Sequence, residues 1–349
     1  MLIRCHADDL RVSLTRARVL AAWFGAHYRV AFAVPRDDFE AARGFLPADA
    51  QIYRLPPGDD EEAARLQLLH QKHHHRILLV DHPSAGSAYL FRLQRIFDHL
   101  TLFDGGGAGL VHAQVLVNDR FTAASHRYDC SGGVKLLLGP KFHIADPNPL
   151  PVPVQQPLHH LLLCLGEPEL VQRLLRVLAT IEGVPEIHLL CREDDPVRRL
   201  LTTLRDLFPG RKPSPVLLTD DGPFPFERYP FVITEADARC PMFAQRRQFF
   251  LTVAAHKHQL EEAYAINQLG VAPTLGWAAS RTDVELVGQI AAQQADHAGR
   301  TRHAALAGVA VDGKGLSRLA HFIPAEKGVG RGESGAGEAL VEQDPTRSS

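Results

Sequence analysis

Polar side chains stand at the ends of several short apolar runs in this chain. One pair follows the run RILLV, a second follows QVLV, one carboxylate precedes three consecutive glycines, and another ends FVITE. These residues are Asp81, His82, Asp104, Asn118, Asp119 and Glu235. Carboxylates, amides and imidazoles can accept protons or bind hydroxyl groups, and glycines let the backbone approach a ligand or turn sharply. These residue types indicate a binding site if the fold brings the run ends together.

Histidines also gather in the sequence and raise the question of a metal site. His70 and residues 73–75 crowd the end of a predicted helix, and His159 and His160 precede a predicted strand. A metal site needs imidazoles that converge with carboxylates or thiolates in space, whereas adjacent residues on one helix point in different directions. We therefore interpret the helical histidines as a solvated helix end and expect neither a metal site nor a cofactor.

Glycine fingerprints and nucleophile motifs are missing. The chain has no complete G-x-G-x-x-G fingerprint, no P-loop, no Ser-His-Asp signature and no nucleophile elbow. The lack of a glycine fingerprint argues against a dinucleotide-dependent oxidoreductase.

Strands and helices alternate along the chain and would position the polar run ends. In the first half, strands are predicted at 1–5, 28–34, 51–55, 76–81, 100–103, 114–118 and 135–139, with helices at 14–24, 38–44, 59–75 and 88–99. In the second half, strands are predicted at 160–165, 186–191, 215–219, 231–235 and 249–254, with helices at 169–181, 195–208, 259–269, 282–294 and 315–322. Short strands that are apolar on both faces indicate an α/β fold with mostly parallel sheets and helices on both sides. Ligands of such sheets bind beyond the carboxyl ends of the strands.

A proline-rich stretch interrupts this alternation. Residues 146–157, DPNPLPVPVQQP, contain five prolines in twelve residues, and no helix or central strand can run through them. We predict a first Rossmann-like lobe at 1–146, a linker at 147–157, a second Rossmann-like lobe at 158–323 and a disordered tail at 324–349. An ordinary loop inside one domain is the alternative. Two lobes joined at a hinge would have an interdomain cleft, where a ligand could sit.

The overall composition excludes several classes of partner. The net charge is −2, which gives no general attraction for nucleic acid or anionic membranes. No apolar run approaches the length of a membrane span. The five cysteines are far apart and form no C-x-x-C pair, which favours reduced thiols over disulfides or structural zinc. We therefore expect a cytoplasmic protein.

Several short motifs, in their order and spacing, resemble one family. In the first half they are LTRARVLA, LLVDHP, LFDGG, LVND and LLLGPKFHI; in the second half they are LLLCLG, HQLEEAYAINQLG and VDGKGLSRLAHFI. The chain, from about residue 1 to 322, resembles the two-lobed GT-B nucleotide-sugar proteins. Within them it is most similar to the UDP-2,4-diacetamido-2,4,6-trideoxy-β-L-altropyranose hydrolase of pseudaminic-acid biosynthesis and its spore-coat polysaccharide relatives. The resemblance implies a UDP-linked sugar as ligand.

The chain departs from the family at the positions that carry its chemistry. The family's catalytic histidine corresponds to about Ser13, which cannot titrate near neutral pH and so cannot act as the general base. His6 stands where the family has an acidic residue two positions after its arginine, here Arg4. The glycine-rich phosphate turn corresponds to Gly166 and the following Glu-Pro-Glu, and a glutamate there would repel a diphosphate.

Further departures lie in the second half. The family's Ser-Ser turn and glutamate correspond to residues 236–241, and its Asn-Gln pair becomes His258 and Gln259. If the site is active, the resemblance implies that His6 or His82 supplies the base. The residues that would bind substrate are Arg4, Ser13, Asp81, Asp104, Asn118, Gly166, His258, Gln259 and Asn267.

Two functions follow from the resemblance and its departures. The first is a UDP-sugar hydrolase-like protein of pseudaminic-acid or surface-glycan biosynthesis, which cleaves the anomeric C–O bond and releases UDP. The second is a non-catalytic GT-B scaffold that acts as a binding subunit, with a glycan-pathway protein as partner. The missing base and the glutamate in the phosphate turn favour the second function as the mechanism, whereas the resemblance favours the first as the pathway.

Overall fold

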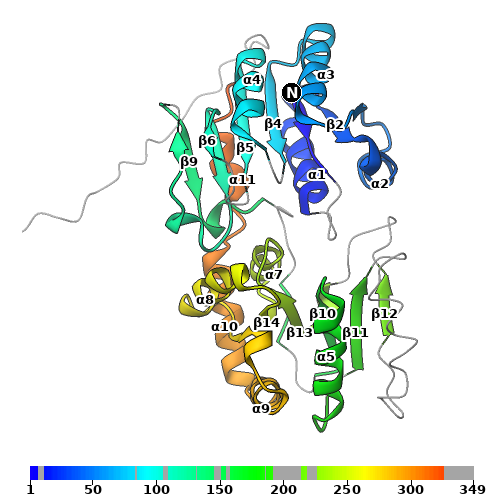
Figure 1. The fold of residues 1–349 in the computed structure, drawn as a ribbon, viewed down its shortest axis with the longest axis vertical. Helices are drawn as coiled ribbons and strands as arrows, with labels where there is room; N and C mark the ends of the chain where they lie inside the picture. The colour runs from blue at the N-terminus through cyan, green and yellow to red at the C-terminus, as the bar shows by residue number, and fades with distance from the viewer. Residues whose placement is uncertain are drawn as a thin grey trace, which may run out of the picture.

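The computed structural model consists of two α/β lobes stacked along the long axis of the molecule (Figure 1). It describes residues 1–6, 12–82, 85–104, 109–130, 132–144, 151–154, 158–184, 186–191, 214–217 and 226–325. The predicted helix at 195–208, the glycines after Asp104, most of the proline-rich stretch and the chain beyond residue 325 lie outside these residues.

The first lobe is built on a sheet of seven strands in the order β3-β2-β1-β4-β5-β7-β9, all parallel. The strands are β1 (Leu2–Arg4), β2 (Ala31–Pro35), β3 (Ile52–Leu55), β4 (Ile77–Asp81), β5 (His99–Phe103), β7 (Val115–Asn118) and β9 (Lys135–Leu138). Two short strands, β6 (Leu110–Val111) and β8 (Asp129–Cys130), pair separately. The order reverses between β1 and β4, and such a switch point opens a crevice at the carboxyl ends of these strands.

Helices cover both faces of the first sheet because successive side chains of its strands alternate between them. Leu2 and Ile3 enter different core clusters. One cluster receives α1 (Val12–Phe24) and α2 (Phe39–Phe45), and the other receives α3 (Asp59–His73) and α4 (Ser87–Ile96).

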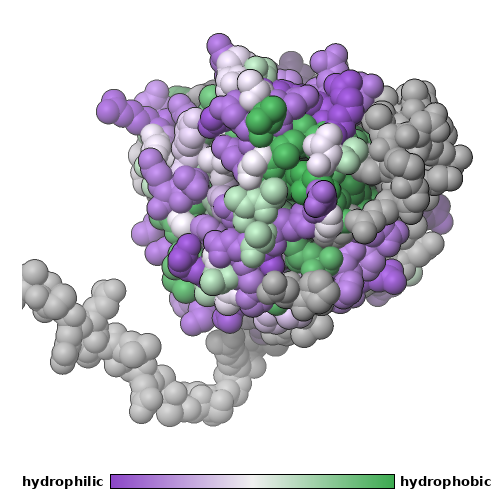
Figure 2. Space-filling view, turned by 90° about the horizontal axis from the view of Figure 1, so that it is seen from below, coloured by the Kyte–Doolittle hydropathy of each residue, from purple (hydrophilic) through white to green (hydrophobic). Residues whose placement is uncertain are grey.

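The second lobe is built on a parallel sheet in the order β12-β11-β10-β13-β14-β15. Its strands are β10 (His160–Cys164), β11 (Glu186–Cys191), β12 (Ser214–Leu217), β13 (Phe231–Glu235), β14 (Phe249–Ala254) and β15 (Thr274–Trp277). The switch point lies between β10 and β13. Helices α5 (Pro168–Ala179) and α9 (Asp283–Ala295) cover one face, whereas α7 (Cys240–Gln245), α8 (Leu260–Gln268) and α10 (His297–Ala310) cover the other. Seen from below, this lobe is mostly hydrophilic with a hydrophobic area near its middle (Figure 2).

The carboxyl edges of the two sheets meet near the end of β7. Glu262, in the first turn of α8, accepts hydrogen bonds from the backbone N–H groups of Phe121 (2.9 Å) and Thr122 (3.1 Å) and from the Thr122 hydroxyl (2.6 Å). The Phe121 side chain enters the core of the second lobe. This contact joins residues just after β7 to those just after β14, so the strand ends of the two lobes face one another.

The last helix returns to the first lobe. Helix α11 (Gly315–Ala320) contributes Leu316 and Leu319 to the core cluster beneath α1, although residue 323 was expected to close the second lobe. A Cβ added at Gly315 would lie 2.2 Å from the backbone oxygen of His143, so only glycine allows this approach. Val152, inside the predicted linker, is buried in the second lobe and its N–H donates to the oxygen of Arg246 (2.8 Å). The lobe limits in the chain remain a prediction.

Most predicted elements are confirmed, with ends shifted by up to three residues. Strand β15 and helices α7 and α10 were not predicted. In the described part of the chain, no helix has both the length and the apolar character to cross a membrane. The cysteines at 5, 130, 164 and 240 form no disulfide.

Candidate functional site

The switch point of the first sheet is closed by a buried arginine. Arg4, the last residue of β1, is 3% exposed; its guanidinium contacts both Glu62 carboxylate oxygens (3.0 and 3.2 Å) and donates to the Asp81 backbone oxygen (2.8 Å). Arg4 was predicted to bind substrate, but in the structure the N–H groups of its guanidinium donate to Glu62 and to the Asp81 backbone. Its role in the structure is to tie β1 to α3 and β4.

His6 lies just beyond β1 at this switch point. Its backbone N–H donates to the hydroxyl of Ser13 (3.2 Å), and its Nδ1 lies 3.2 Å from the Asp81 backbone oxygen. Ser13 is buried in the first turn of α1, where its hydroxyl holds the start of that helix against the strand end. Both candidate bases, His6 and His82, follow the carboxyl ends of neighbouring parallel strands, β1 and β4.

The His82 side chain is largely enclosed. Its side chain is 11% exposed, its ring packs at a tilt against that of Tyr89 with the ring centroids 5.4 Å apart, and its Nε2 lies 3.6 Å from Asp59 Oδ1. Burial and the nearby Arg4 lower the pKa of His82, which keeps its imidazole neutral near pH 7. These contacts turn His82 toward α3 and α4.

A carboxylate–arginine–carboxylate cluster joins the ends of β4 and β7. Arg16, on α1, contacts Asp81 Oδ2 (2.5 Å) and Asp119 Oδ2 (3.2 Å), and His143 Nδ1 lies 2.6 Å from Asp119 Oδ2. Burial alone raises the pKa of Asp119, but Arg16 and His143 outweigh it and hold this pKa well below its usual range. The predicted site residue Asp81 is therefore paired with Arg16. Arg16 was not predicted as a site residue, although it lies three residues after Ser13 and therefore on the same face of α1.

Asp104 and Asn118 lie together at the ends of β5 and β7. The amide of Asn118 donates to the Tyr128 hydroxyl (2.6 Å), and Asp104 also bonds this hydroxyl. Burial, with Asp104 opposing ionisation, raises the pKa of Tyr128 to about 12, so the hydroxyl stays protonated. Asn118 is fully buried and Asp104 is 9% exposed. Both residues position the loop after β7 in this structure.

The switch point of the second sheet holds an anion-binding turn that is filled by the protein. Glu235, at the end of β13, accepts hydrogen bonds on Oε1 from the backbone N–H groups of Gly166 (2.8 Å) and Glu167 (3.2 Å), at the start of α5. Its other oxygen accepts from the side-chain amide of Gln259 (2.9 Å). Arg239 lies 3.6 Å from the same oxygen. Helix starts offer free N–H groups to anions, and here a carboxylate takes the position of one.

Gln259 joins this turn to the start of α8. Its oxygen accepts from the backbone N–H groups of Ala255 (2.7 Å) and His256 (3.1 Å), while its amide reaches Glu235. His258 is exposed and stacks on His256 at a ring distance of 5.5 Å. Asn267 is exposed and lies eight residues beyond Gln259, which is about 12 Å along the helix.

The residues at 236–241 replace the expected phosphate turn by a self-contained one. Asp237 accepts from the backbone N–H of Arg239 (2.9 Å) and pairs with its guanidinium. Pro241 lies in the first turn of α7 and is buried. The arginine of this segment is therefore already paired with Asp237 and with Glu235, which directly precedes the segment.

The structure thus brings the predicted residues into two groups. His6, Ser13 and Asp81 gather at the first switch point, and Gly166 and Gln259 gather at the second. His82 and Asn118 make other contacts, and Asn267 is exposed on α8. Glu235 is the central residue of the second group; its place at a strand end signalled it, but its role as an internal anion did not follow from the sequence.

Solved structures share this architecture. The chain is similar to MurG from Acinetobacter baumannii (TM-score 0.65, 11% identity, covering 93% of this chain and 98% of that one). It is also similar to a putative UDP-N-acetylglucosamine 2-epimerase from Listeria monocytogenes (TM-score 0.59, 11% identity, 91% and 94%). A third is the spinosyn rhamnosyltransferase SpnG complexed with thymidine diphosphate (TM-score 0.56, 13% identity, 92% and 100%).

No protein-family model and no curated protein sequence matches the chain. At these identities the structural likeness concerns the fold. The predicted α/β fold of two Rossmann-like, GT-B-type lobes with mostly parallel sheets is confirmed.

Proposed function

We propose that the protein binds a UDP-linked sugar between its lobes as a GT-B-type scaffold of surface-glycan biosynthesis, without the hydrolytic turnover of the pseudaminic-acid enzyme that it resembles. Its ligand would be a nucleotide sugar, and the protein would act as a binding or partner subunit.

The position of Glu235 carries this proposal. A diphosphate at the start of α5 needs the N–H groups of Gly166 and Glu167, and both already donate to the Glu235 carboxylate. A phosphate charge about 4 Å from this carboxylate would be opposed by roughly 1 kcal/mol in water and about 4 kcal/mol at an effective dielectric constant of 20. Glu235 therefore weakens the interaction that would hold and polarise the leaving UDP.

The fold and the neighbouring structures support the ligand class. The names of the similar structures include a glycosyltransferase complexed with thymidine diphosphate and a putative UDP-sugar epimerase. Asp81 and Asp119 are both paired with Arg16 at the first switch point, so neither offers an unpaired carboxylate as a base. The contacts at both switch points are therefore consistent with a protein that binds a sugar nucleotide without hydrolysing it quickly.

A second candidate is the UDP-sugar hydrolase itself, and the position of His6 favours it. This histidine is partly exposed at the end of β1, and its Nδ1 contact with the Asp81 oxygen would orient the ring. Positioned in this way, it could deprotonate a water beside an anomeric carbon. A general base contributes roughly 10²–10⁴-fold to a rate.

Release of UDP from UDP-2,4-diacetamido-trideoxy sugar and UDP-N-acetylhexosamines tests the two candidates. We expect the purified protein to release UDP no faster than a His6→Asn variant. A wild-type rate about 10²-fold or more above that variant would identify His6 as a base and establish the hydrolase instead.

A further inference from the structure

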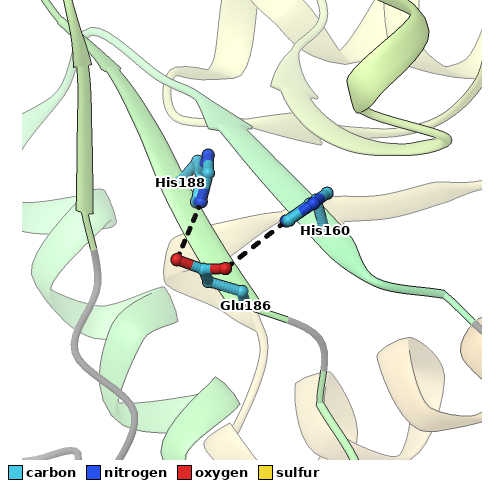
Figure 3. A group of neighbouring side chains, drawn as sticks. All are labelled: His160, Glu186 and His188. Carbon is cyan, nitrogen blue, oxygen red and sulfur yellow. Dashed lines mark ion pairs between the residues drawn. The ribbon is translucent and has the colours of Figure 1, made fainter.

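Two histidines and a glutamate converge at the edge of the second sheet opposite the carboxyl ends. His160 begins β10, Glu186 begins β11, and His188 lies two residues further on β11 (Figure 3). In the parallel register His160 is paired with Glu186, and Glu186 and His188 are two residues apart, so the three side chains share one face. Their ligand atoms all lie within 4.8 Å of one another.

The spacing of these atoms suits a metal ion. Glu186 Oε2 lies 3.6 Å from His160 Nδ1, and Glu186 Oε1 lies 3.2 Å from His188 Nε2. Ligands about 2.0–2.2 Å from a tetrahedral Zn²⁺ lie roughly 3.3–3.6 Å from each other. His160 Nδ1 and His188 Nε2 are buried, and neither atom has a hydrogen-bond partner within the part of the chain that the structure describes.

The ring of His188 is already oriented for coordination. Its Nδ1 lies 3.0 Å from the hydroxyl of Tyr229, which leaves Nε2 directed at Glu186. Histidines that bind metals are held in this way by a partner on the other ring nitrogen.

The cluster is open to solvent on one side. The side chains of His160 and Glu186 are 36% and 53% exposed, whereas that of His188 is 17% exposed. An ion can therefore enter, and a water can complete its coordination. The cluster is separate from Gly166 at the other end of β10, since six residues of strand span about 20 Å.

We propose that His160, Glu186 and His188 form a binding site for one divalent transition-metal ion of the Zn²⁺ type. Two imidazoles and one carboxylate leave one coordination position for water. The ion joins the beginnings of β10 and β11 and so fixes the edge of the second lobe. This site is independent of the proposed sugar-nucleotide function.

Calorimetric titration of the metal-free full-length protein with ZnCl₂ tests this site. We expect one tight site in the wild type, and a loss of more than about 10–100-fold in affinity when His188 or His160 is replaced by Gln, since 10–100-fold is typical of losing an outer partner. Tyr229→Phe removes only the outer hydroxyl and should cost about 10–100-fold. Co²⁺ in place of Zn²⁺ should give the intense visible absorption of a four-coordinate ion, and this absorption should vanish in the same variants.

A matched control separates this site from the histidines at the end of α3. His73→Gln combined with His74→Asn removes two of those histidines and should leave the affinity unchanged; Asn suits the left-handed backbone of residue 74. If the histidine variants fail to fold, Glu186→Gln at its exposed position should still abolish the site. Zn²⁺ affinity that is unchanged in Glu186→Gln, or that disappears in the control variant, would overturn the proposal and leave a simple ion pair between Glu186 and the histidines.

Discussion

Replacing Glu262 should loosen the junction of the two lobes. This carboxylate is 1% exposed and accepts three hydrogen bonds from the segment after β7, with Arg120 Nε 3.4 Å away. Removing one partner of a buried charged contact costs about 3–5 kcal/mol, because the remaining groups lose their solvation without compensation. We therefore expect Glu262→Ala to lower the free energy of unfolding by about 3–5 kcal/mol. Glu262→Gln should cost about 1–3 kcal/mol, because one acceptor oxygen remains.

Urea unfolding followed by circular dichroism and tryptophan fluorescence measures this change. The chain has two tryptophans, Trp23 on α1 and Trp277 at the end of β15, so each lobe carries one fluorescent reporter. A separation of the unfolding transitions of the two lobes in Glu262→Ala would show that the junction couples them. Glu261→Gln, at the exposed neighbouring position, is the control and should change the stability by less than about 0.5 kcal/mol. If Glu262→Ala matched this control, the buried contact would not hold the lobes together.

Four further outcomes are expected. Arg16→Ala should cost about 3–5 kcal/mol because it leaves two enclosed carboxylates without their cation. The pKa of Asp119 is lower in the folded protein than the value of about 3.9 expected for the unfolded chain, so the ionised carboxylate stabilises the fold at higher pH. This stabilisation is lost as the pH falls. Between pH 5 and pH 3 the free energy of unfolding, measured with urea, should therefore decrease more in the wild type than in Arg16→Ala. Gly315→Ala should lower the melting temperature, since its methyl group would meet the first-lobe backbone, whereas Gly288→Ala, with open space around it, should not. Deleting residues 326–349 should change the free energy of unfolding by less than about 0.5 kcal/mol, measured in the same way.

Much of the fold could be predicted from the sequence because its strands are short, apolar and separated by helices. Strand β4 has four buried positions in a row before the partly exposed Asp81, as a strand covered on both faces should. Helix α10 was missed because its residues His297–Ala310 are rich in alanine, glycine and arginine and show little apolar periodicity. The return of α11 to the first lobe could not be predicted, since a helix of six residues does not indicate which core it enters.

The site was only partly predictable because polar strand ends look alike in a sequence. Asp81 and Asn118 both follow apolar strands, yet one lies at the switch point while the other is fully buried. What separates them is the sheet order, which depends on contacts far apart in the chain. The cluster of His160, Glu186 and His188 could likewise not be predicted from the sequence, because His160 and His188 lie 28 residues apart and meet only when β10 pairs with β11.

Calorimetric titration of UDP into the wild type and Glu235→Gln tests the central claim most directly. The substitution keeps an acceptor for the turn but removes its charge, so the affinity for UDP should rise by about 5-fold to 10³-fold, which corresponds to the roughly 1–4 kcal/mol of charge repulsion. Glu169→Gln makes the same charge change at an exposed position in the first turn of α5 and should alter the affinity by less than about 2-fold, as expected for a solvated charge. An unchanged or lower UDP affinity in Glu235→Gln would contradict the account, because the carboxylate would then not occupy the place of a phosphate.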